Sequence, residues 1–115
     1  MIAVIFEVRP KPERRDDYLD IAASLRETLE SIDGFISVER FQSLTDEGKM
    51  LSVSFFRDEK AVADWRRTMR HRSAQAAGRA EIFEDYRLRV ASVIRDYGMN
   101  DREQAPEDSR AAHEP

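Results

Sequence analysis

The sequence predicts one small α+β domain whose strands and helices follow the order β-α-β-β-α-β. Three observations support this prediction. Apolar residues alternate along residues 2–9, which is the period of a strand. Apolar residues recur at helical spacing along residues 18–32. Two further strand-like runs are separated by Thr45-Asp46-Glu47-Gly48, a segment of residues that favour turns.

The first predicted strand covers residues 2–9 and stops at Pro10, which cannot donate a ladder hydrogen bond. A helix follows, with Pro12 in its first turn. The apolar stripe of this helix consists of Tyr18, Ile21, Ala22, Leu25, Leu29 and Ile32. Asp33-Gly34 ends it, because glycine readily adopts the left-handed backbone that often follows a helix.

Residues 35–43 and 49–56 are predicted to form a hairpin, with Gly48 at a positive φ in the turn. The second of these strands has one fully apolar face and one mixed face. Asp58 is placed to accept hydrogen bonds from the first turn of a second helix. That helix carries Val62, Trp65 and Met69 on one face. We expect Gly78 to end or break it.

A last strand is expected from about residue 83 to residue 97. The complete order is the ferredoxin-like pattern, with two helices on one face of a four-stranded antiparallel sheet. Apolar residues also occupy part of the second sheet face, which nothing in the same chain covers. We therefore expect a homodimer in which two sheets pack face to face.

The composition excludes several classes of site. The chain has no cysteine, so it has no disulfide, no thiolate metal ligand and no cysteine nucleophile. Its two histidines, His71 and His113, lie far apart in the sequence, and we predict no metal site. No glycine-rich loop follows a strand to hold a phosphate.

The charge and hydropathy patterns give the expected organisation and location. Residues 99–115 are acidic and poor in large apolar side chains, so we predict a folded domain over residues 1–98 and a disordered acidic tail over residues 99–115. The nearly neutral folded part gives no nucleic-acid footprint. No apolar run is long enough for a membrane span, and the opening segment lacks the features of a signal peptide, so we expect a cytoplasmic protein.

The second predicted helix and last strand carry a distinctive combination of residues: Trp65, then His71-Arg72, then Gln75, then Gly78-Arg79. Together with the opening strand and the Asp33-Gly34-Phe35 junction, this combination resembles the antibiotic biosynthesis monooxygenase family over about residues 1–98. The resemblance implies a dimeric α/β barrel with a small-molecule pocket between helices and sheet. Members include cofactor-independent monooxygenases of aromatic polyketides, haem-degrading enzymes and isomerases, so the fold is implied more firmly than the reaction.

Two branches of that family can be compared residue by residue. In the polyketide-oxidising branch, the tryptophan has a tyrosine six residues later and an asparagine four residues before; here these positions are His71 and Ala61. In the haem-degrading branch, an asparagine on the first strand and a histidine ten residues after the tryptophan hold the haem. Here those positions are Phe6-Glu7 and Gln75. The resemblance therefore argues against haem degradation, and we predict no cofactor.

The candidate catalytic residue is His71, because imidazole titrates near neutral pH and can take a proton from a phenol. The candidate substrate-binding residues are Phe6, Trp65, Arg72, Gln75 and Tyr86. For three of these residues a structural role is open as well: a surface position for the histidine, and core packing for the tryptophan and the tyrosine.

An arginine-rich stretch surrounds the histidine, made up of Arg66, Arg67, Arg70, Arg72 and Arg79. This stretch is suited to an anionic substrate. It is equally suited to acidic residues of a partner subunit, the reading that we favour here because acids are plentiful.

Two functions are consistent with these observations. The first is a cofactor-independent monooxygenase that oxidises a small aromatic, phenolic or quinone-type compound. In this hypothesis His71 helps to form a phenolate, Trp65 stacks on its ring, and Gln75 or Arg72 holds the oxyanion. The second is a dimeric small-molecule-binding or stress-associated protein that uses the same pocket without catalysis.

Overall fold

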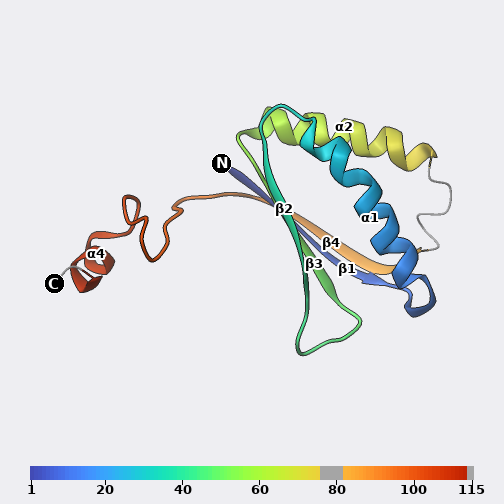
Figure 1. Cartoon of the computed structure of the whole chain (residues 1–115), viewed down its shortest axis with the longest axis horizontal. Coiled ribbons are helices and arrows are strands. Elements are labelled where there is room, and N and C mark those ends of the chain that lie inside the picture. Colours follow the sequence, from blue (N-terminus) through green and yellow to red (C-terminus); the bar gives the residue numbers. More distant parts are fainter. Residues whose placement is uncertain (76–81, 114–115) are drawn as a thin grey trace.

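The computed structural model describes residues 1–75 and 82–113 of the chain (Figure 1). Its elements are β1 (Ile2–Pro10), the 3₁₀ turn η1 (Pro12–Arg14), α1 (Arg15–Glu30), β2 (Phe35–Gln42), β3 (Met50–Phe56), α2 (Glu59–Gln75), β4 (Phe83–Ser92) and α4 (Glu107–His113).

The four strands form one antiparallel sheet in the order β2-β3-β1-β4. Helices α1 and α2 lie on the same face of this sheet (Figure 1). The predicted ferredoxin-like fold is therefore confirmed, and the sheet of one chain is open, with β2 and β4 at its edges. Across the sheet, Val4 of β1 lies between Ser54 of β3 and Val90 of β4.

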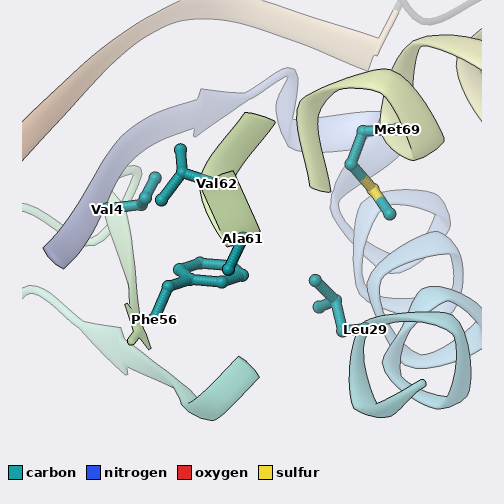
Figure 2. Close-up of a cluster of buried hydrophobic side chains, with 6 residues drawn as sticks. All are labelled: Val4, Leu29, Phe56, Ala61, Val62 and Met69. Atoms are coloured by element: carbon teal, nitrogen blue, oxygen red, sulfur yellow. The ribbon is translucent and has the colours of Figure 1, made fainter. Parts of the chain in front are cut away.

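The main core joins both helices to the sheet. Its buried members are Val4, Leu29, Phe56, Ala61, Val62 and Met69 (Figure 2). Phe56 has no exposed surface. Its ring lies 5.8 Å from that of Phe35 and 6.1 Å from that of Trp65, measured between centroids. This aromatic group ties the end of the hairpin to α2.

The last strand is shorter than predicted, since β4 ends at Ser92 and not near residue 97. Ser92 lies opposite Ile2, the first residue of β1, so the partner strand ends there. One further backbone hydrogen bond, from Val93 N to the carbonyl of Met1 at 3.0 Å, follows before the chain leaves the sheet.

The predicted positive φ at Gly48 is wrong, because among the described residues only Gly34 has one. Side chains organise the hairpin turn instead. The amide of Gly48 donates to Asp46 Oδ1 at 3.1 Å, and Arg9 forms an ion pair with the same carboxylate. A Cβ atom at Gly48 would lie 2.8 Å from Arg9 Nη1, so glycine here leaves room for the arginine.

The segment predicted as a disordered acidic tail contains turns and the helix α4 among its described residues. It leaves the sheet, extends away from it and ends in α4 (Figure 1). Arg102 donates hydrogen bonds of 3.1 Å to the carbonyl groups of Gly98 and Ser109, and Ala105 is buried. These local contacts offset part of the conformational entropy that is lost when this segment is ordered.

Two short signals position α2 over the sheet. Gly34 has a φ of 91°, and its carbonyl accepts a 2.7 Å hydrogen bond from the amide of Arg57. Asp58 caps α2, as predicted: its Oδ1 accepts a 2.9 Å hydrogen bond from the amide of Ala61. The C-terminal end of α1 and the N-terminal end of α2 therefore lie at the same corner of the sheet.

We expect Gly34→Ala to lower the free energy of unfolding, measured by urea denaturation, by about 1–3 kcal/mol. The backbone there is one that L-residues rarely adopt, and the new Cβ would lie 2.8 Å from the Cβ of Ala61. Gly98→Ala is the control, because nothing lies within 4 Å of its Cβ position. Equal stability of the two variants would contradict this account of Gly34.

The cap also predicts a pH dependence. The hydrogen bond from the Ala61 amide, helped by Arg57, holds the pKa of Asp58 below its ordinary value of 3.8 despite some desolvation. Because the folded pKa is lowered, the stabilisation is complete above the unfolded pKa and is lost as pH falls through the folded one. Asp58→Asn retains capping ability without a titrating group. The melting temperature of the wild type should therefore exceed that of Asp58→Asn at pH 6. The gap should start to narrow as the pH falls below about 4 and close only below the folded pKa of Asp58. A gap of constant size would contradict the prediction.

Candidate functional site

A cavity of about 410 Å³ lies between the sheet and the two helices. Its floor is the helix-facing side of all four strands, and its walls are the inner faces of α1 and α2. Most of the lining is apolar, as in typical small-molecule sites. Leu25 and Leu29 contribute from α1, and Val62 and Met69 contribute from α2.

The cavity borders the solvent along the edge strand β4. Three of its lining residues there are exposed although they are apolar or aromatic: Tyr86 by 61%, Leu88 by 43% and Val90 by 49%. In contrast, Val4 and Ser54, which lie deeper in the sheet on the same floor, are buried. An apolar molecule therefore has a route into the cavity over β4.

Trp65 combines the two roles that the sequence left open. Its ring packs near Phe56 at the edge of the core, and its side chain also lines the cavity. It is half-buried, so part of the indole is held by packing while part faces the cavity. An indole held in this way offers a π-face to a planar ligand.

Phe6 and Tyr86 line the cavity together at its β4 side. Their ring centroids are 5.6 Å apart, and Phe83 lies 6.0 Å from each of them. Tyr18 of α1 extends this group, 5.7 Å from Phe83. Because Tyr86 is exposed, it does not have the core-packing role that the sequence had left open for it. The structure thus brings Phe6, Trp65 and Tyr86 around one cavity.

The other three predicted site residues are His71, Arg72 and Gln75. Their backbone belongs to α2, the helix that carries Trp65. Their side chains lie outside the part of the chain that the structure describes, so their roles remain predictions. Gly78 and Arg79 fall wholly outside the described residues.

The cavity floor also has polar groups that were not among the candidate residues predicted from the sequence. Arg40 of β2 and Ser52 of β3 are cross-strand neighbours, and both line the cavity. Ser54 is buried beside them, with its hydroxyl 3.5 Å from the carbonyl of Val4. One feature of the sequence could have indicated Arg40: it stands two residues after the apolar Val38 on the same predicted strand, so both side chains lie on one face.

The described lining carries positive charge and no acid. Its charged members are Arg40 on the floor and Arg66 on α2. The neighbouring Arg67 instead pairs with Asp64 of its own chain. Hydrogen bonds from Lys60 and Arg67 hold the pKa of Asp64 below its ordinary range, against some desolvation. Part of the arginine-rich stretch is therefore neutralised within α2, without a partner subunit.

Among the described side chains, which are those of residues 1–69 and 82–111, no group of three or more acidic or histidine side chains could hold a metal ion. No helix in residues 1–75 and 82–113 is long and apolar enough to cross a membrane.

Comparisons with known proteins agree on a family. The family model for antibiotic biosynthesis monooxygenases matches residues 1–77. A protein of Pyricularia oryzae named jasmonate monooxygenase ABM is 50% identical over 101 residues, which are 88% of this chain and 47% of that protein. The chain thus spans about half the length of this relative. The Bacillus subtilis protein YqjZ is 31% identical over 81% of this chain and 79% of its own length.

Solved structures of other proteins share this fold. The solved structure of Rv0793 from Mycobacterium tuberculosis superposes with a TM-score of 0.73 over 84% of this chain and 98% of its own. At 17% identity, this similarity concerns the fold alone. The matched family model, the sequence identities and the open four-stranded sheet lead to one conclusion: the chain belongs to the antibiotic biosynthesis monooxygenase family.

Proposed function

We propose that this protein is a monooxygenase that acts on a small, largely apolar organic compound bound between the sheet and the helices. The observation that carries the proposal is the apolar cavity beside Trp65, which borders the solvent over β4. The relative named jasmonate monooxygenase supports it. Jasmonate and phenolic or quinone-type compounds are therefore the first substrates to test.

The proposed chemistry for a phenolic substrate needs no bound cofactor. Trp65 stacks on the substrate ring, and His71 takes the phenolic proton. The electron-rich ring then passes an electron to O₂, and recombination at a ring C–H carbon para to the oxygen, with return of the proton from His71, gives a hydroperoxide. Loss of water leaves a carbonyl group at that carbon, so the phenol and O₂ become a quinone and H₂O. The substrate supplies all four electrons. Hydroxylation of a saturated carbon would instead require two electrons from an added donor such as a reduced nicotinamide.

A second function is favoured by one observation. The described lining contains no carboxylate and no imidazole, and the predicted base, His71, has a side chain that the structure does not describe. A protein that binds the same compounds without turnover is consistent with such a cavity. It would be a small-molecule-binding or stress-associated module.

Oxygen uptake distinguishes the two functions. The purified protein is mixed under air with hydroquinones, phenols or jasmonate, with and without a reduced nicotinamide, and products are analysed for ¹⁸O from ¹⁸O₂. We expect uptake with incorporation of one labelled oxygen atom per turnover. His71→Ala should lower kcat by about 100-fold or more, because a general base is lost. His113→Ala, which removes the other histidine of the chain, should have no effect. Binding without uptake would support the non-catalytic module, and full activity of His71→Ala would remove the catalytic role of His71.

We also propose that two copies pair through the sheet face opposite the helices, which we call the open face. The register places Ala3, Ile5 and Ala91 on this face together with Leu51, Val53 and Phe55. Glu7 is also there, and ion pairs with Lys49 and Arg89 partly neutralise it. A contiguous apolar face of this kind is typical of an interface.

Light scattering of the intact chain should report twice the mass of one chain. Val53→Glu should convert the protein to a monomer, because it places a charge in the middle of the open face. Leu44→Glu is the matched control, since Leu44 lies in the hairpin loop and is 98% exposed. A wild-type monomer, or a Val53→Glu variant that remains dimeric, would contradict pairing through this face.

A further inference from the structure

Arg40 differs from most other arginines of the described chain. Eight of the twelve other arginines whose side chains are described have a partner in the same chain. Arg15 and Arg102 donate hydrogen bonds. Six form ion pairs with acids: Arg9, Arg14, Arg26, Arg57, Arg67 and Arg89. Arg40 has no such pair and no hydrogen bond within the described residues. Its Nε is buried and lacks an acceptor. The protein therefore leaves donor groups of this guanidinium unused.

Arg40 lines the cavity, so these unused donors lie beside the space that a ligand would occupy. Arg40 lies on the cavity floor, opposite Ser52 on the neighbouring strand. The next acid along β2, Glu39, lies opposite Val53 and so belongs to the other face of the sheet. No acid lines the described part of the cavity. A ligand that enters the cavity can therefore supply the acceptor that Arg40 lacks.

An unpaired guanidinium beside apolar walls is costly, because burying a charge without a partner loses its hydration. A carboxylate is the matching group, since its two oxygens accept parallel hydrogen bonds from the planar guanidinium. Ser52 adds a hydroxyl donor next to this point, and no hydrogen bond of that hydroxyl is found within the described residues. Apart from Ser54, the rest of the floor, including Phe6 and Leu88, is apolar or aromatic.

We infer that the cavity is built for an apolar monocarboxylate, with the carboxylate bound by Arg40 at the β2 side and the apolar body between Trp65 and β4. This inference rests on the proposed function in so far as the bound acid is the substrate. It adds a substrate class and a specificity-determining residue. Arg66, which is exposed on α2, provides a second positive charge that attracts the anion.

Trp65 provides a direct assay of binding, because it is the only tryptophan of the chain and lines the cavity. Its fluorescence is titrated at pH 7.5 with two pairs of probes: jasmonate and its methyl ester, and 4-phenylbutyrate and its methyl ester. Each pair keeps the apolar body and differs in charge. In the wild type, we expect the acid of at least one pair to bind about tenfold or more tightly than its ester. Equal affinities within both pairs, or no binding by any probe, would overturn the inference.

The variants locate the group responsible. Arg40→Gln should bind acid and ester equally, while Arg40→Lys should retain part of the preference because it keeps the charge without the planar fork. Arg26→Gln is the matched control, since Arg26 is exposed on α1 and pairs with Glu30. A preference that persists in Arg40→Gln, or that disappears in Arg66→Gln alone, would overturn the assignment to Arg40. If Arg40→Gln does not fold, Arg40→Lys and the wild-type comparison still decide the matter.

Oxygen uptake with the same acids and esters separates this inference from the proposed function. These probes have no phenolic group, so a reduced nicotinamide is added to supply the two electrons that their hydroxylation needs, and a hydroquinone is assayed in parallel. Acid-selective binding that depends on Arg40, without uptake, supports the carboxylate site and contradicts the monooxygenase. Uptake with acid and ester at equal kcat/KM supports the monooxygenase and contradicts the carboxylate site.

Discussion

The burial of Phe56 is the interaction on which the rest of the structure depends. This side chain ends β3, has no exposed surface, and lies against Phe35 of β2 and Trp65 of α2 (Figure 2 shows its place in the core). Full burial of a phenylalanine is worth about 1.5–3 kcal/mol relative to exposure, a large part of the net stability of a small domain. Because Asp58 starts α2 only two residues later, the same contact sets where the helix begins and holds the inner edge of Trp65.

The cavity follows from the incomplete coverage of the sheet. The packed core lies beneath the start of α2 and the end of α1, where Val4, Leu29 and Phe56 meet. Toward β4 the strand has an uncovered outer edge, and its inward side chains such as Leu88 are exposed. Close packing is therefore kept at this corner and in a second buried cluster of Val8, Tyr18, Met50 and Ile82, while an apolar space borders the solvent along β4. This arrangement lets a rigid core position Trp65 without filling the space beside it.

The distribution of charge also differs between the cavity and the rest of the domain. Outside the cavity, acids and arginines neutralise each other at short range, as Arg9 does with Asp46 and Arg57 does with Asp33. In these exposed pairs the net stabilisation is small. In the described cavity lining, Arg40 and Arg66 have no acid beside them. The uneven distribution makes the cavity attractive to anions although the whole chain has a net charge of −4.

The sequence by itself determined the elements, because the signals for them are local. Alternation predicted β1, and the single residues Asp58 and Gly34 marked where one helix begins and another ends. The sequence also indicated Trp65 as a cavity residue, through the family motif in which this tryptophan stands.

The sequence did not determine which face of each strand meets the helices, since a period of two does not distinguish the faces. On β3 the mixed face with Ser52 and Ser54 lines the cavity, while the fully apolar face is open. On β2 a shift in register between Phe35 and Ser37 changes the alternation, so Phe35 and Val38 both pack against the core. Only the tertiary structure could place Arg40 on the cavity floor, because its position depends on pairing with a distant strand and not on its neighbours in the chain.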